Sequence, residues 1–196
     1  MARGPRLVEP GGIYHLTARG NRRQAIFRDD HDRRIFLALL DRVVRTRSWS
    51  CLGYCLMPNH YHVVVETPNA ALSAGIQRLN GVYAQAFNHR HEVDGHLFQG
   101  RFHSVAVESD WHLLELARYL ALNPVRSGLC LRADDWVWGS HRALLGREPA
   151  PVFVLTAAVL AHFGKPAAAA RKRYEMFVND TTPFPQMESL PAMSGV

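Results

Sequence analysis

Short runs in which hydrophobic and polar residues alternate predict four β-strands, because successive side chains of a strand point to opposite faces. The runs cover residues 13–18, 52–57, 61–66 and 101–107. Pro58 and Asn59 lie between the middle two runs, which predicts a tight connection there.

Three longer segments have the period of an amphipathic helix. The first is capped by Asp29 or Asp30 and runs to about Thr46, and the second covers residues 71–87. The third is capped by Ser109 or Asp110 and is expected to end at Pro124. The order β-α-β-β-α-β-α predicts an α+β fold, a ferredoxin-like antiparallel sheet with helices on one face and a final helix that carries candidate catalytic residues.

The pattern weakens after about Gly146. We therefore expect one domain over residues 1–146 and a C-terminal extension over 147–196. Within the extension, residues 149–164 and 167–178 each have the composition of a helix, and a loose tail is expected from residue 181.

Composition narrows the class of protein. Hydrophobic residues make up 47% of the 196 residues, enough for a core, and no apolar stretch reaches the about 18 residues that span a bilayer. The first 12 residues lack the apolar region of a signal peptide. The three cysteines are too few and too irregular for a disulfide framework, so we expect a cytoplasmic protein with free thiols and no membrane partner.

The positive charge of the chain favours a nucleic-acid partner. Lysine and arginine total 23 against 17 acidic residues, and only Lys165 and Lys172 are lysines. The guanidinium fork of arginine binds phosphate through two hydrogen bonds. An arginine-rich proteome would produce the same bias, so charge alone does not identify a site.

The first candidate for chemistry is the pair His60 and His62 in the third predicted strand. Strand alternation places both imidazoles on one face and Tyr61 on the other. Two imidazoles on one face can share a metal ion, or they can be polar residues on the open face of a half-buried strand. This motif alone leaves both interpretations open.

The second candidate is a stripe on the third predicted helix, where Glu115, Tyr119 and Asn123 recur at a spacing of four. A helix packed across the sheet would bring this stripe over the two histidines. Asn123 would then add an amide oxygen, and two imidazoles with one amide leave positions that Mg²⁺ or Mn²⁺ would fill with water and phosphate oxygens. Zinc remains an alternative, since imidazoles also suit zinc. Tyr119 is either an ordinary tyrosine at the edge of the core or a nucleophile activated by positive charge.

These residues belong to a longer series of motifs. In order along residues 5–146 the chain contains Arg19-Gly20-Asn21, MPNHYH at 57–62, QGRF at 99–102, RYLALNPVRSGL at 118–129 and WVWGS at 136–140. Together they resemble the REP-associated tyrosine transposases, a group within the single-tyrosine, HUH-type, IS200-like transposase superfamily.

The resemblance implies a site and a reaction. His60 and His62 would bind the divalent metal with Asn123, and Tyr119 would be the nucleophile. The family cleaves single-stranded DNA beside a hairpin, which leaves a 5′-phosphotyrosine on the protein and a free 3′-OH. The REP-associated group acts as monomers, which favours a monomer here. Two departures are Tyr61 at a position that is usually aliphatic, and His103 where lysine or arginine is more common.

Several residues are expected to contact the DNA through phosphate bonds or base stacking. The polar set is Arg19, Asn21, Arg22, Arg23, Arg101, His103 and Arg126, and the aromatic candidates are Phe27 and Phe102. Each arginine could instead be a solvated surface charge.

Two other functions compete with the transposase interpretation. A non-catalytic nucleic-acid-binding module would use aromatic side chains on the face of a ferredoxin-like sheet. A hydrolytic metalloenzyme would form no covalent intermediate. A single tyrosine nucleophile favours strand transfer over hydrolysis, because the phosphotyrosine ester conserves the free energy of the broken phosphodiester.

Overall fold

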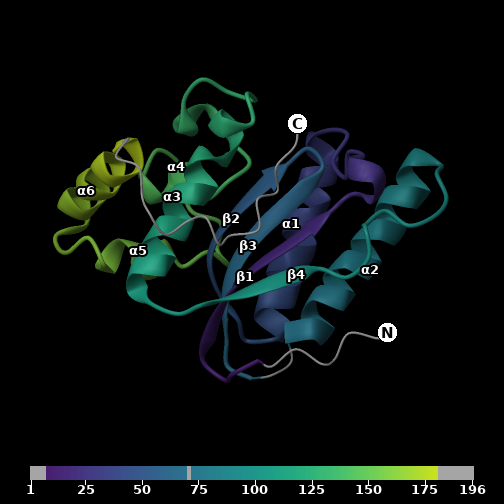
Figure 1. Ribbon diagram of the computed structural model, residues 1–196, viewed down its shortest axis with the longest axis horizontal. Helices are drawn as coiled ribbons and strands as arrows, with labels where there is room; N and C mark the ends of the chain where they lie inside the picture. Colours follow the sequence, from purple (N-terminus) through teal and green to yellow (C-terminus); the bar gives the residue numbers. More distant parts are fainter. Residues whose placement is uncertain (1–7, 70–71, 181–196) are drawn as a thin grey trace.

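A four-stranded antiparallel sheet forms the centre of the computed structural model, which describes residues 8–69 and 72–180 (Figure 1). The strand order is β2-β3-β1-β4. The strands are β1 (Gly12–Arg19), β2 (Ser50–Met57), β3 (His60–Thr67) and β4 (His103–Val107). The predicted α+β, ferredoxin-like fold is confirmed.

Helices cover both faces of this sheet (Figure 1). They are α1 (Asp30–Thr46), α2 (Leu72–His91), α3 (Asp110–Arg126), α4 (His141–Leu144), α5 (Thr156–Ala161) and α6 (Ala167–Asn179), with the short 3-10 helices η1 (Asn21–Arg23) and η2 (Ala133–Asp135). One hydrophobic cluster joins the sheet to α1 and α2, and a second joins it to α3, α5 and α6.

The expectation of helices on one face was therefore wrong. Tyr61, Val63 and Val65 of β3 point into the first cluster, whereas Val64 and the neighbouring Met57 of β2 belong to the second. Because β2 and β3 are apolar on both faces, each face requires a covering layer.

Helix α3 is held over the second face by its own apolar stripe. Ser109 caps it by accepting a hydrogen bond from the backbone N–H of His112 at 3.1 Å, and Leu116 and Leu120 are buried against the sheet. The helix continues past Pro124 to Arg126, two residues beyond the predicted end. Proline in the last turn loses only its own donor, and its carbonyl still accepts from the N–H of Leu129 at 2.9 Å.

The segment after Gly146 packs against α3. Val159 and Leu160 of α5 and Tyr174 of α6 are buried in the same cluster as the apolar residues of α3. Helix α5 lies within the first segment expected to be helical, and α6 matches the second apart from one further residue at its end. The division near residue 146 stays a prediction. The expected tail from residue 181 lies outside the described residues. In the described part of the chain no helix is long and apolar enough to cross a membrane.

Candidate active site

Strand β3 presents His60 and His62 to the face that α3 covers. Tyr61 points the other way, where its hydroxyl donates to Asn80 Oδ1 at 2.8 Å. His62 is 1% exposed, and His60 is buried beside it with the two ring centroids 4.9 Å apart. The alternation of the strand thus brings the two imidazoles together, as the sequence predicts.

Helix α3 places Tyr119 and Asn123 against these histidines. The Tyr119 ring meets the His62 ring edge-on, with centroids 5.4 Å apart. The Asn123 amide nitrogen lies 3.3 Å from His62 Nε2, and the same side chain hydrogen-bonds to Tyr119. Glu115, the third member of the predicted stripe, instead pairs with Arg118 at 2.8 Å.

His15 of β1 completes the cluster and was missed in the sequence. Its Nε2 lies 2.9 Å from Nδ1 of His62, and the two rings stack with centroids 5.1 Å apart and an interplanar angle of 18°. The register that pairs Thr17 with His62 puts His15 on the same face. In the sequence, His15 is only a polar residue at an alternating position of β1. Its proximity to His62 cannot be predicted until the register between β1 and β3 is known.

Hydrogen bonds fix the tautomers of both candidate ligands. The Asn59 amide nitrogen donates to the Arg23 carbonyl at 3.2 Å, so its oxygen is the atom that faces His60 Nδ1 at 2.6 Å. His60 Nδ1 therefore carries the proton, and Nε2 keeps its lone pair. In His62, Asn123 donates to Nε2, so Nδ1–H donates to His15. Nε2 is thus the unprotonated nitrogen of both histidines, and a metal at His62 would replace the hydrogen bond from Asn123.

Burial keeps the histidines neutral. It lowers the pKa of His60 to about 4, with Arg19 adding to the effect, and it lowers the pKa of His15 to about 4. The pKa of His62 is well below its usual value for the same reason. Burial raises the pKa of Tyr119, which the hydrogen bond to Asn123 and the charge of Arg126 oppose. The phenol is therefore protonated near neutral pH unless further positive charge comes close.

The donor set fits a hard divalent cation with open coordination positions. The described residues contain no group of three histidine, cysteine or acidic side chains that could hold a metal. The candidate ligands are therefore the neutral imidazoles of His60 and His62 and the amide of Asn123. A set of three ligands leaves coordination positions for water and phosphate oxygens.

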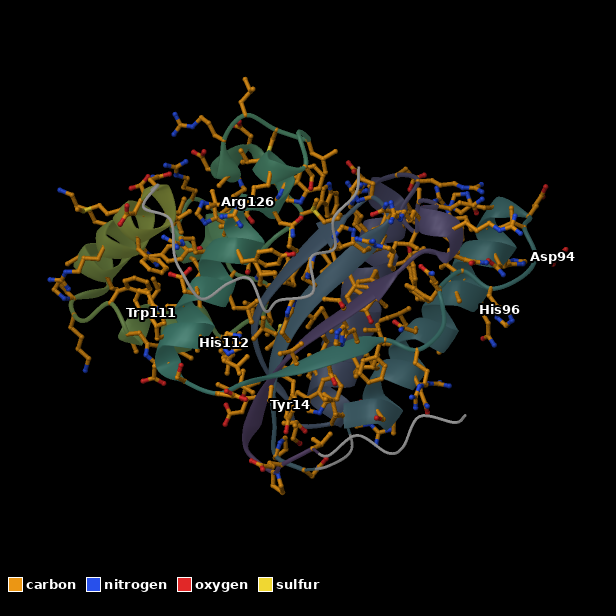
Figure 2. All side chains as sticks on the ribbon, viewed as in Figure 1. Tyr14, Asp94, His96, Trp111, His112 and Arg126 are labelled. Atoms are coloured by element: carbon orange, nitrogen blue, oxygen red, sulfur yellow. The ribbon has the colours of Figure 1, made fainter. Side chains whose placement is uncertain are left out.

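Arginines approach the site from two sides. Arg19 pairs with His60 in the register of β1 and β3, and Arg126 lies in the last turn of α3, at the opposite end from His112 (Figure 2). Arg22 and Arg23 are exposed on η1 with φ of 52° and 60°, a region that is uncommon for side chains other than glycine.

The rest of the predicted DNA-binding set is more dispersed. Asn21 is exposed in η1, just after Gly20, where a Cβ atom would lie 2.1 Å from the Gln24 carbonyl oxygen and only glycine fits. His103 is exposed on β4, on the face of the histidines because it pairs with Thr17. Arg101 precedes β4 and lines a cleft beside α2.

The two aromatic side chains proposed for base stacking are core residues. Phe27 is 2% exposed and packs against Phe36 and Tyr83, and Phe102 is 5% exposed in the same cluster. Rings enclosed in this way cannot stack on a nucleobase, so that expectation was wrong.

Comparison with known proteins relates this arrangement to transposases. The family model for IS200-like transposases matches residues 10–123. A solved structure of a REP-associated tyrosine transposase bound to a REP hairpin superposes with a TM-score of 0.64 at 20% identity, covering 79% of this chain and 92% of that one. At this identity the likeness is one of fold.

Two further structures are more distant. A protein of Deinococcus radiodurans assigned as a transposase matches with a TM-score of 0.41 at 18% identity, over 61% of this chain and 95% of that one. The tRNA(His) guanylyltransferase of Saccharomyces cerevisiae matches with a TM-score of 0.48 at 8% identity, over 94% and 86%. Neither supports an argument about function. No curated protein matches the chain.

Proposed function

This chain belongs to the IS200-like transposase family, and from that premise we propose that it is a metal-dependent endonuclease and strand transferase for single-stranded DNA, with Tyr119 as its nucleophile. One observation carries the proposal. The Asn123 amide contacts both His62 and the half-buried Tyr119, so the proposed nucleophile and the candidate metal ligands form one cluster within a single chain.

The proposed reaction replaces one phosphodiester with another. The Tyr119 hydroxyl oxygen attacks the scissile phosphorus in line and gives its proton to a neighbouring water. The bond from phosphorus to the 3′ oxygen breaks, and that oxygen leaves as a 3′-hydroxyl after taking up a proton. The product is a 5′-phosphotyrosine ester, which another 3′-hydroxyl can attack to rejoin DNA without ATP.

The chain prepares Tyr119 for this step. Burial raises the pKa of Tyr119, and the hydrogen bond to Asn123 and the charge of Arg126 partly offset that rise, so a metal ion nearby would supply the remaining stabilisation of the phenolate. Mg²⁺ or Mn²⁺ held by His60, His62 and Asn123 would polarise the scissile phosphate and stabilise the charge that develops on its oxygens. His15 and Asn59 act as positioning residues, because each fixes the ring of one histidine through its Nδ1.

The geometry favours this reaction over a passive nucleic-acid-binding module. Such a module stacks bases on aromatic side chains of an open sheet face. Here α3 lies over the sheet face where His15, His60 and His62 stand, and the aromatic residues Tyr14 and Tyr61 are buried on the other face.

The proposed substrate is single-stranded DNA beside a hairpin. Support comes from the family, from a relative of the same fold that was solved with a REP hairpin, and from the arginines of η1 and α3 at the edge of the site. We further propose that a monomer is sufficient, since Tyr119 and both histidines meet within one chain. The proposed compartment is the cytoplasm, which free cysteines favour.

A labelled oligonucleotide tests the proposal and its polarity. After incubation of the full chain with a hairpin that carries a single-stranded flank, a label on the 3′ side of the break should remain on the protein in a denaturing gel. A label on the 5′ side should be released on a shorter strand. Cleavage with both labels free of protein would indicate hydrolysis, and attachment of the 5′ side would reverse the proposed polarity.

A further inference from the structure

A groove of about 270 Å³ lies between α1 and α2, the helices that cover the sheet face opposite the histidines and Tyr119 (Figure 1). Its described lining residues belong to these two helices and to Arg47, which directly follows α1. The volume is close to the lower end of the about 300 to 1,000 Å³ typical of ligand sites. The sheet therefore separates this groove from the proposed catalytic site.

Aliphatic side chains from both helices form the floor of the groove. Leu39 and Val43 come from α1, and Leu79 and Val82 come from α2. Val43 and Leu79 are buried, whereas Leu39 and Val82 are half-buried and keep apolar surface that the fold does not cover. An apolar side chain that entered the groove would leave water on this floor, which favours its binding.

Three arginines surround the floor and have no acidic partner among the residues that the structure describes. Arg42 and Arg78 are exposed, and Arg47 is half-buried. Arg45 of the same layer differs, because it forms an ion pair with Asp41. The negative end of α1 attracts Arg47, but it does not account for Arg42 earlier in the helix or for Arg78 in the first half of α2.

The period of the helix explains why cationic and aliphatic side chains meet at the groove. Arg42, Val43 and Arg47 lie three, four and eight residues after Leu39, so all four share one face of α1. Arg45 lies six residues after Leu39 and is off this face. The arrangement is thus an apolar floor with a positively charged rim.

This combination selects the chemistry of an occupant. Arginine binds a carboxylate or a phosphate through two parallel hydrogen bonds. A phosphodiester backbone would satisfy the arginines, but it carries no aliphatic side chain for the floor. A peptide in which acidic residues flank a leucine or phenylalanine would satisfy both parts of the groove.

We propose that the groove docks an acidic segment of a partner protein, with an apolar side chain on the floor and carboxylates on Arg42 and Arg78. The proposal goes beyond the proposed function and does not depend on DNA cleavage. Because the groove and the catalytic site lie on opposite sides of the sheet, the chain would hold the partner and its DNA at the same time.

Fluorescence anisotropy of labelled peptides tests the proposal with the full chain. The probes are short aspartate peptides with one leucine or phenylalanine, placed at each position in turn, and each has a match with glycine at that position. We expect the best probe to bind the wild type at least about tenfold more tightly than its glycine match, because the apolar side chain leaves water on the floor. Arg42→Ala and Arg78→Ala should each weaken its binding about fivefold, the upper end for an exposed ion pair.

Arg45→Ala is the matched control, since it removes the same charge from α1 outside the groove and should bind the peptide as the wild type does. Binding should also persist when hairpin DNA saturates the chain. Equal losses in Arg42→Ala and Arg45→Ala would indicate attraction by net charge alone, and glycine matches that bind equally well would exclude the floor; either result overturns the proposal.

Two further outcomes would assign the groove to another occupant and also contradict the proposal. Displacement of the peptide by hairpin DNA, with weaker hairpin binding by Arg42→Ala and Arg78→Ala, would identify a DNA surface. Self-association of the wild type that these two variants abolish would identify a second copy of the chain as the occupant.

Discussion

Replacing His15 by phenylalanine tests whether the hydrogen bond to His62 organises the metal site. The variant keeps an aromatic ring where His15 stacks on His62 at 5.1 Å and lies edge-on to Tyr119 at 6.2 Å. It removes only the acceptor that lies 2.9 Å from His62 Nδ1. The packing of the cluster is therefore largely retained, and the lost hydrogen bond is the main change.

The magnitude follows from burial. His15 is 6% exposed and His62 is 1% exposed, so bulk water has little access to replace the lost acceptor. A buried donor without a partner costs about 1 to 3 kcal/mol. Loss of such an outer hydrogen bond lowers metal affinity by about 10- to 100-fold, because the ring is free to rotate or to change tautomer. We expect a loss of Mn²⁺ affinity in that range.

The assay measures Mn²⁺ binding to the full chain, with the free ion detected by electron paramagnetic resonance. Thermal melting confirms that each variant is folded. His15→Gln is the matched control, since its amide oxygen can accept from His62 Nδ1–H and should restore most of the affinity. Wild-type affinity in a folded His15→Phe protein would refute the positioning role. Equal losses in the phenylalanine and glutamine variants would point to general packing instead.

Four other outcomes are expected. Tyr119→Phe should abolish cleavage and adduct formation while hairpin binding in a gel-shift assay is retained, and appreciable cleavage would mean that another group attacks. EDTA, or His60→Ala, should remove activity, and undiminished cutting in EDTA would exclude the metal. Burial holds the pKa of His60 and of His141 at about 4 in the folded protein, whereas the unfolded histidines take up protons below pH about 6.5. Because the unfolded chain then binds more protons than the folded one, the melting temperature should fall as the pH is lowered from about 6.5 to about 4. A melting temperature that stays constant over this range would contradict the prediction. A fully paired duplex should resist cleavage relative to a flanked hairpin of the same sequence, since unpairing costs a few kcal/mol per step, and equal cutting would overturn the substrate assignment.

Patterns within single elements were sufficient to predict which candidate site residues share a face. His60 and His62 share a face because strands alternate, and Tyr119 and Asn123 share a face because helical neighbours recur at four residues. Both rules act within one element, so the sequence reveals them directly. The order of elements likewise predicted the sheet, since few folds accommodate it.

The features that were missed depend on pairing between distant segments. His15 contacts His62 only because β1 and β3 pair in one register, 47 residues apart. Phe27 follows a turn rather than a periodic segment, and its burial depends on how α1 and α2 close around it. The covering of both sheet faces was missed because β2 and β3 carry apolar residues on each face, which the strand alternation alone did not reveal.

The central claim is that Tyr119 becomes covalently joined to DNA, and mass spectrometry of the digested adduct tests it most directly. The full chain is incubated with a flanked hairpin and Mn²⁺, digested with nuclease and protease, and mapped by peptide. The account predicts a nucleotide 5′-phosphate on the peptide that contains Tyr119 and on no other tyrosine. A modification on another residue, or cleaved DNA without any modified peptide, would contradict it.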